Sequence, residues 1–287
     1  MRGRGKTRTR QVSGGPFLKW AGGKTQLLPE LERHVPKFDR YFEPFFGGGA
    51  FFFRLVSEDC PITAFLSDAN SELVNAYNAV KRDVDQLIAC LELHESGYRK
   101  DPARYYYALR RATPTSNVEK AARLIALNKT CYNGLYRVNR KGEFNVPIGR
   151  YKNPVICDRA MLRAASAALN QINVHLLACD YKEILKSTQE GDFVYLDPPF
   201  VPSSPTANFV DYTAGGFGKE DQKELADTFR DLDRRGCKVL LSNSDTKLTR
   251  MLYADFPRSS VSVTRAISCK GSSRRGYAEL LVRNYTL

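Results

Sequence analysis

Five short apolar runs, each ending in a turn or an acidic residue, constrain the fold of this chain more than any other feature. They read RYFEPF, ITAFLSD, NVHLLACD, DFVYLD and KVLLSNSD. Each has the length of a strand and is apolar on both faces, as in parallel strands that helices cover on either side. Helical patterns lie between several of them, over residues 71–80, 158–170, 219–234 and 246–253. This alternation predicts an α/β fold with a doubly wound sheet.

Three parts of the chain depart from this alternation of strands and helices. The final segments, SSVSVTRAIS and YAELLVRNY, alternate like a pair of antiparallel strands. Residues 70–157 lack a good parallel strand and contain three helical patterns, so we predict a mostly helical insertion there. The core domain is then discontinuous and comprises residues 16–69 and 158–287. Residues 1–15 carry five basic residues and no acidic one, which predicts a disordered basic arm.

The charge balance favours a polyanionic partner. The chain has 44 Lys and Arg against 31 Asp and Glu, a formal net charge of +13. The end of the insertion, CYNGLYRVNRKGEFNVPIGRYKNP, mixes basic residues with aromatic residues and asparagines. This composition is typical of a loop or hairpin that binds nucleic acid, and it equally fits a solvated basic loop.

Other function classes find little support. The 7 cysteines are scattered without a C-x-x-C pair, and the 3 histidines stand apart, so we expect neither a metal site nor a disulfide framework. No apolar run is long enough to span a bilayer, and no signal-peptide pattern opens the chain. We therefore expect a reduced, soluble, cytoplasmic protein.

The stretch KWAGGKT, residues 19–25, ends in the way that a phosphate-binding P-loop ends. The complete pattern G-x-x-x-x-G-K-[ST] requires a glycine where this chain has Leu18, and it requires a preceding buried strand. A basic polar segment precedes it instead. A nucleotide hydrolase therefore remains only a weak alternative.

Three polar motifs fall at the predicted strand ends, where open α/β sheets bind their ligands. EPFFGGGAFF places Gly47 and Gly49 in a tight turn that lets the backbone approach a ligand, or that is simply a tight loop. Asp68 ends the next strand and suits ribose hydroxyl groups, or it caps the following helix. Asp180 suits an adenine amino group, or it caps a loop.

The fourth strand end, VYLDPPF, is the most specific. Two prolines stiffen the turn and orient the preceding carbonyl groups. The Asp197 carboxylate and the Pro198 carbonyl then form a rigid pair of acceptors beside the flat ring of Phe200. These groups suit a planar ring that carries an exocyclic amino group. The alternative is a purely structural Pro-Pro turn.

Six segments in order make the chain similar to the Dam-type DNA adenine-N6 methyltransferases. They are FLKWAGGKTQLLPEL, YFEPFFGGGAFFF, the basic segment CYNGLYRVNRKGEFNVPIGRYKNP, DPPF, TANF and VLLSNSDTKLT. The resemblance implies a Rossmann-like catalytic domain that binds S-adenosylmethionine, with an inserted target-recognition domain. It also implies an enzyme that acts on double-stranded DNA, associates with the nucleoid and needs no metal, and we expect a monomer.

The resemblance implies a role for each motif residue. Asp197, Pro198 and Phe200 would be catalytic. Trp20 and Lys24 would contact the methionine part of the cofactor, Asp68 its ribose and Asp180 its adenine. The complete cofactor set is Trp20, Lys24, Phe45, Gly47, Gly49, Asp68, Asp180, Tyr181 and Asp197.

The same resemblance implies a DNA-binding set: Lys19, Tyr132, Asn133, Leu135, Arg137 and Pro147. Tyr132 would act as a wedge between base pairs, and Arg137 suits the O6 and N7 acceptors of guanine. Since this segment follows the enterobacterial pattern closely, GATC is the expected target. The family usually has DPPY, whereas this chain has Phe200, which keeps the stacking face and loses a hydroxyl group. A cytosine-N4 DNA methyltransferase and a non-catalytic DNA-binding protein remain as alternatives.

Overall fold

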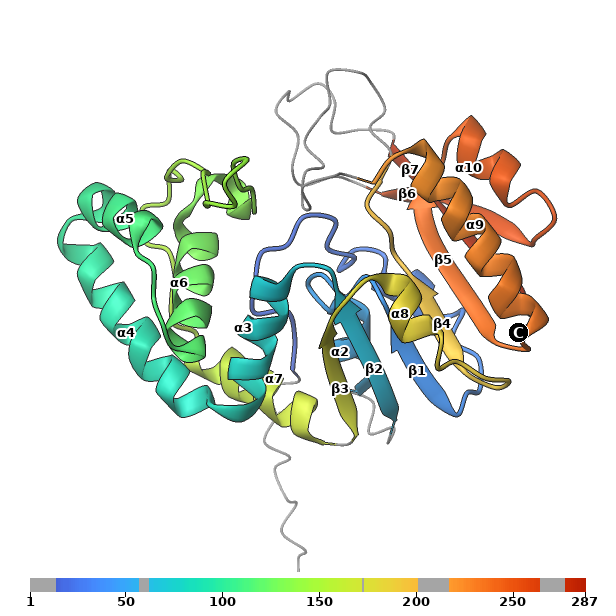
Figure 1. The fold of residues 1–287 in the computed structure, drawn as a ribbon, viewed down its shortest axis with the longest axis horizontal. Helices are drawn as coiled ribbons and strands as arrows, with labels where there is room; N and C mark the ends of the chain where they lie inside the picture. The colour runs from blue at the N-terminus through green and yellow to red at the C-terminus, as the bar shows by residue number, and fades with distance from the viewer. Residues whose placement is uncertain (1–13, 57–61, 172, 201–216, 264–276) are drawn as a thin grey trace, which may run out of the picture.

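The computed structural model describes residues 14–56, 62–171, 173–200, 217–263 and 277–287. The predicted basic arm lies outside these ranges except for its last two residues. The described chain forms a seven-stranded sheet with helices on both faces (Figure 1). The mixed α/β, Rossmann-like fold predicted from the sequence is thereby confirmed.

The sheet has the order β3-β2-β1-β4-β5-β7-β6. Its five parallel strands coincide with the five apolar runs: β1 (Arg40–Glu43), β2 (Thr63–Asp68), β3 (Val174–Ala178), β4 (Phe193–Leu196) and β5 (Lys238–Ser244). The predicted antiparallel pair is β6 (Arg258–Val263) and β7 (Tyr277–Arg283). The strand order reverses between β1 and β4, which pair in parallel. The crevice at their carboxyl ends is where such sheets bind ligands.

Alternating side chains along each strand supply two separate cores, because successive residues of a strand point to opposite faces. Tyr41, Phe193 and Tyr195 belong to the larger core, whereas Phe42 and Val194 belong to the smaller one. Helices α8 (Tyr181–Leu185) and α9 (Lys219–Arg234) supply buried side chains to the smaller core. Helix α10 (Lys247–Leu252) follows β5 on that side of the sheet (Figure 1).

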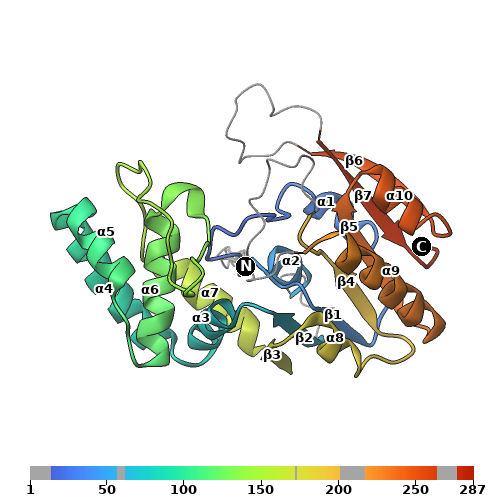
Figure 2. The same cartoon turned by 45° about the horizontal axis from the view of Figure 1, so that its top comes forward.

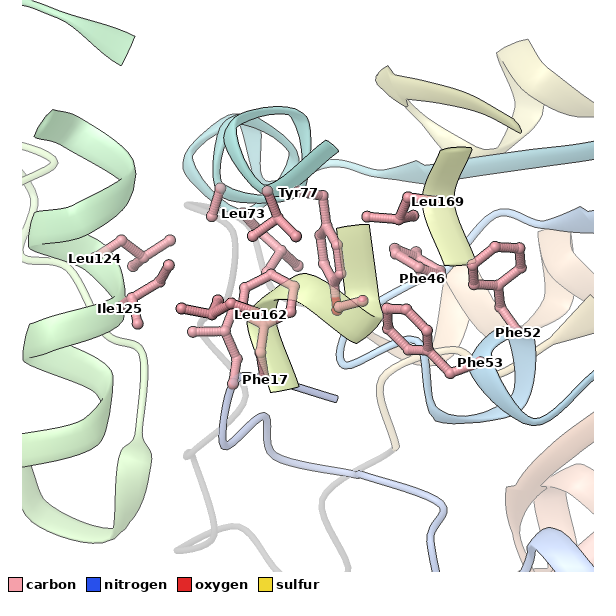
Figure 3. Packing of buried hydrophobic residues seen from close by; sticks show 14 of the residues in the cluster. Phe17, Phe46, Phe52, Phe53, Leu73, Tyr77, Leu124, Ile125, Leu162 and Leu169 are labelled. Atoms are coloured by element: carbon pink, nitrogen blue, oxygen red, sulfur yellow. The ribbon is translucent and has the colours of Figure 1, made fainter. Parts of the chain in front are cut away.

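The larger core is continuous from the sheet into the predicted insertion. It takes in side chains from α1 (Leu28–Glu32), α2 (Ala50–Val56), α3 (Ser71–Arg82) and α7 (Arg159–Asn170). It continues into α4 (Val84–Lys100), α5 (Pro102–Arg111) and α6 (Asn117–Thr130), which stand together beside the sheet (Figure 2). Figure 3 shows Phe17 and Tyr77 between α6 and the phenylalanines of α2. The boundaries at residues 70 and 157 stay a prediction.

Local sequence explains where the insertion helices begin. The Asn70 side chain accepts a hydrogen bond from the backbone N–H of Leu73 and caps α3. Asp101 caps α5, whose first residue is Pro102. Ser116 and Glu119 form a capping box at the start of α6. These short signals lie within a few residues of each helix start, so they can be read from the local sequence.

Two expectations differ from the structure. Strand β3 lies at the sheet edge and exposes His175, Leu177 and Ala178, so only part of it is covered as a doubly buried strand would be. The stretch KWAGGKT precedes the first strand, β1, and therefore does not link a strand to a helix as a P-loop does. The P-loop alternative is wrong for this reason.

Phe51→Ala tests the larger core. Phe51 is buried and packs edge-on against Tyr41 and Tyr195. Removing its ring should lower the free energy of unfolding by about 3–5 kcal/mol, because transfer and cavity costs add. The matched control is Leu93→Ala on α4, where the side chain is 72% exposed; its effect should stay within about 0.5 kcal/mol. Urea unfolding of both variants measures the difference, and equal midpoints would contradict this description of the core.

Candidate active site

The candidate site lies at the carboxyl ends of β1 and β4, next to the loop that precedes α1. Strand β4 delivers Asp197, Pro198 and Phe200, and β1 leads into the turn with Gly47 and Gly49. The carboxyl ends of neighbouring parallel strands meet at one edge of the sheet. The motifs of three separate segments therefore come together in one place.

An ion pair joins two of these segments. The Lys24 ammonium group lies 2.6 Å from Asp197 Oδ1 and 3.8 Å from Glu279 Oε2, and only 6% of Lys24 is exposed. Lys24 also donates to the carbonyl of Gly22 and lies 4.6 Å from the ring centre of Phe200. Burial raises the pKa of Asp197 to about 6, Lys24 opposes this rise, and Glu279 adds to it. At neutral pH, Asp197 is therefore mainly an ionised acceptor.

The two prolines hold the acceptors that follow β4. Pro198 is buried, and its carbonyl oxygen accepts no hydrogen bond within the described part of the chain. The next carbonyl, that of Pro199, accepts a hydrogen bond from Gln222 Nε2 at 3.1 Å. The Asp197 carboxylate and the Pro198 carbonyl are thus available as acceptors, and Lys24 contacts both Asp197 and the Phe200 ring; their role as a stiff acceptor pair stays a prediction.

A second buried acid, Glu43, ends strand β1. It accepts a hydrogen bond of 2.7 Å from the hydroxyl group of Tyr41. Burial raises the pKa of Glu43 to about 8, although the bond from Tyr41 lowers it, and the charge of Asp197 raises it further. Glu43 is therefore mostly protonated at neutral pH, which leaves Asp197 as the ionised carboxylate at this end of the two strands.

The turn after β1 has a geometry that favours glycine. Gly47 has a φ of 48°, and a Cβ atom there would lie 3.1 Å from Cδ1 of Trp20. The Asp68 carboxylate accepts hydrogen bonds from the backbone N–H groups of Gly47 and Asn70. Burial raises the pKa of Asp68, and these bonds oppose the rise. Since Asn70 caps α3, the alternative role of Asp68 as the helix cap is wrong.

Aromatic side chains border this turn. Phe45 stacks on Tyr181 with ring centres 5.0 Å apart, and Trp20 packs against Tyr136 at 5.6 Å. Asp180 is exposed and caps α8 by accepting from the backbone N–H of Lys182. The site therefore suits a ligand that carries both hydroxyl groups and a planar heterocycle. The carboxylate of Asp68 can accept hydrogen bonds from hydroxyl groups, the flat rings can stack on a heterocycle, and Gly47 lets the ligand approach the backbone.

The basic end of the insertion forms a hairpin, residues 131–149. Its arms meet at bridges between Cys131 and Ile148 and between Val138 and Phe144. The carbonyl of Val146 accepts hydrogen bonds from Tyr106 and Arg110 of α5, which fasten the returning arm to the helices.

The hairpin exposes most of the residues predicted to bind DNA. Tyr132 is 42% exposed, and Arg137 and Pro147 are also exposed. Asn145 holds the Arg137 guanidinium group through its side-chain oxygen, 2.7 Å from Nε. Asn133 adopts a φ of 56° in the 3₁₀ turn η1 (Tyr132–Gly134).

Asn133 and Leu135 are both partly buried, and Leu135 also packs against the larger core.

Asn128 at the end of α6 fastens the hairpin to the N-terminal loop. Its Oδ1 accepts from the backbone N–H of Lys19 at 2.8 Å, and its Nδ2 donates to the carbonyl groups of Lys19 and Gly134. The Lys19 ammonium group lies 4.0 Å over the ring of Tyr151. Lys19, next to Trp20, is thereby held beside the hairpin, so the two predicted binding regions are contiguous.

Sequence reasoning assigned no role to several residues of this site. Asn243 ends β5, and the rule that pointed to Asp68 and Asp197 would also have found it. Glu279 is a lone acid in an apolar strand, and Gln222 occupies an apolar position of α9. Asn128 and Tyr136 carry no comparable signal.

No helix among the described residues is both long and apolar enough to cross a membrane. The same residues also contain no group of three or more His, Cys, Asp or Glu side chains placed to hold a metal ion.

Comparison with known proteins gives consistent matches. The model of the family "D12 class N6 adenine-specific DNA methyltransferase" matches residues 20–267. The chain is 44% identical to the Type II methyltransferase M1.LlaDCHI of Lactococcus lactis subsp. cremoris, over 94% of this chain and 95% of that protein. It is 43% identical to M.MjaIII of Methanocaldococcus jannaschii (94% and 99%) and 38% identical to the DNA adenine methylase of Escherichia coli K12 (92% and 93%).

Asn128→Ala tests the link between the loop and the hairpin. The substitution leaves the buried carbonyl of Gly134 and the partly buried backbone groups of Lys19 without their partner, so the free energy of unfolding should fall by about 2–4 kcal/mol. Asn78→Ala on α3 is the control, because the Asn78 side chain makes no hydrogen bond with a described residue. Denaturant unfolding measures both variants. Equal stabilities would show that Asn128 does not hold the two segments together.

Proposed function

Because this chain belongs to the D12 class of N6 adenine-specific DNA methyltransferases, we propose that it methylates an adenine rotated out of duplex DNA, with GATC as its target. The enzymes of this family use S-adenosylmethionine. The observation that carries the proposal is the position of the Asp197 and Pro198 acceptors, with Phe200, at the switch point of the sheet.

The position of Asp197 supports base rotation. Its carboxylate is buried at the end of a central strand and paired with a buried lysine. A base stacked inside a duplex cannot reach such a carboxylate, so the adenine must leave the stack. Phe200 then provides a flat face for the extruded ring.

The chemistry needs positioning more than proton transfer. S-adenosylmethionine supplies a methyl group on a sulfonium that is already activated. The Asp197 carboxylate and the Pro198 carbonyl accept hydrogen bonds from the two N6–H groups of adenine, which favours a more tetrahedral nitrogen and aims its lone pair. The N–C bond would form as the bond between the methyl group and sulfur breaks, and one N6 proton would be lost afterwards. Asp197 does not have to remove it beforehand, because it can leave after the transfer.

The cofactor set is proposed on the fit described above. Asp68 would accept hydrogen bonds from the ribose, since its carboxylate is fixed by Gly47 and Asn70. The Phe45–Tyr181 stack and Asp180 border a place for the adenine ring. Gly49 would shape the turn after β1, and Trp20 would lie against that turn beside the methionine part of the cofactor. Lys24 binds Asp197 in this structure, and its contact with the cofactor carboxylate stays a prediction.

The hairpin would read the target. Arg137, held by Asn145, presents its guanidinium group to guanine, whose O6 and N7 accept two hydrogen bonds. Tyr132 would act as the wedge, Pro147 would contact a thymine methyl group, and Lys19 would help to read guanine. Asn133 would approach base edges. Leu135 would have to do so with the part of its side chain that is not packed in the core.

Transfer of labelled methyl groups to matched duplexes tests the function. The duplexes contain GATC, GAAC or GATC already methylated at adenine. Label should enter N6 of adenine in unmethylated GATC alone. Asp197→Ala should abolish this transfer while cofactor binding persists. Label in GAAC would overturn the target, and near-normal turnover by Asp197→Ala would overturn the catalytic role of Asp197.

The dependence of kcat on pH tests the ionised state of Asp197. Since burial raises the pKa of Asp197 to about 6, kcat should fall as the pH drops through 6. Lys24→Met removes the cation that favours the carboxylate, so the midpoint should move to higher pH. Glu279→Gln removes a repelling charge, so the midpoint should move to lower pH.

Single-turnover rates at saturating cofactor and DNA give these midpoints. If the midpoint moved in the same direction in both variants, a group other than Asp197 would control the fall in rate at low pH.

A further inference from the structure

Two buried amide side chains form a hydrogen-bonded relay that ends at the DPPF turn. Asn243, at the end of β5, donates from Nδ2 to Gln222 Oε1 at 2.8 Å. Gln222, in the first turns of α9, donates from Nε2 to the carbonyl of Pro199 at 3.1 Å. Both side chains are 0% exposed. The relay therefore connects two elements of the smaller core to the turn that follows β4.

The direction of the relay is fixed by the backbone. The N–H of Ser244 donates to Asn243 Oδ1 at 2.8 Å, and a backbone N–H can only donate. Asn243 must then present its NH₂ group to Gln222, and Gln222 must present its oxygen to Asn243. The remaining NH₂ group of Gln222 faces Pro199. Each amide orientation follows from the one before it, so neither assignment is arbitrary.

A polar side chain at position 222 is unexpected from packing alone. Leu225, Ala226 and Phe229 lie on the same buried face of α9. An apolar residue would fill this face without the cost of removing an amide from water. The relay thus indicates a requirement at the turn itself, where the Pro199 carbonyl belongs to the peptide unit that joins Pro199 to Phe200.

We infer that Gln222 and Asn243 are positioning residues for methyl transfer. They fix the Pro199–Phe200 peptide unit, and thereby the carbonyl of Pro198 on one side and the ring of Phe200 on the other. This inference rests on the proposed function of Asp197, Pro198 and Phe200. Neither amide touches the adenine in this scheme, because both act through the Pro199 carbonyl.

Gln222→Glu is the decisive variant. A carboxylate would place an oxygen against the Pro199 carbonyl, whereas a protonated carboxyl group donates as the amide does. At pH 8, kcat should be about 10- to 100-fold below that of the unmodified enzyme, because a small misplacement of reacting groups is costly. The ratio of the two kcat values should then rise about tenfold toward pH 6.5 as the buried carboxyl group gains its proton.

Three measurements separate positioning from a general loss of structure. Gln222→Leu lacks a donor at every pH, so its kcat ratio should stay low and flat. Gln86→Glu makes the same charge change at an exposed site on α4, and its ratio should stay near one. Cofactor affinity, followed by the fluorescence of the only tryptophan, Trp20, should be unchanged in all three variants.

Asn243→Asp tests the direction of the relay. A carboxylate at this position would require the Gln222 amide to turn over, which would set its oxygen against the Pro199 carbonyl. The loss of kcat should match that of Gln222→Leu, and the double variant should be no worse than either single one. Additive losses would contradict a relay.

The outcomes are distinguishable from failure of the proposed function. If the unmodified enzyme does not label adenine, the proposed function fails. If the unmodified enzyme labels adenine, and the kcat of Gln222→Glu equals that of the unmodified enzyme at every pH, only the relay is overturned. If Gln222→Glu does not fold, Gln222→Leu decides, and an unchanged kcat in that variant overturns the inference.

Discussion

The ion pair between Lys24 and Asp197 is the contact on which the arrangement of the site depends. It ties the loop before α1 to the end of β4, so Lys19 and Trp20 are brought beside the central strands. Taking both charges out of water is costly, and removing either partner would leave the other buried and uncompensated. Only a closely fixed geometry maintains such a pair. The prolines after Asp197 and the Gly22 carbonyl on Lys24 supply that geometry.

The sequence predicts the sheet and the polar strand ends well, because both depend on short-range patterns. Apolar runs of strand length became β1 to β5, and the helical patterns at residues 71–80 and 219–234 became α3 and α9. Asp68 and Asp197 were found because parallel strands end at one edge. The resemblance to a known family added the expected roles, and those roles remain proposals residue by residue.

The remaining features depend on contacts between distant segments. Nothing near Asn128 indicates that its amide holds the backbone of Lys19 and Gly134. The pairing of Gln222 with Asn243 likewise exists only after α9 has packed on β5. The exposure of β3 follows from its place at the sheet edge, which a strand pattern by itself does not reveal. Tertiary packing, rather than local propensity, decides each of these.

The hairpin contains two kinds of position that contribute differently to stability. Phe144 and Val146 are buried and stabilise the hairpin, so most substitutions there would lower the free energy of unfolding. Arg137 and Pro147 are exposed, and replacing them costs little stability. Under the proposed function, a few surface substitutions would be enough to change the recognised sequence, while the buried scaffold stays intact.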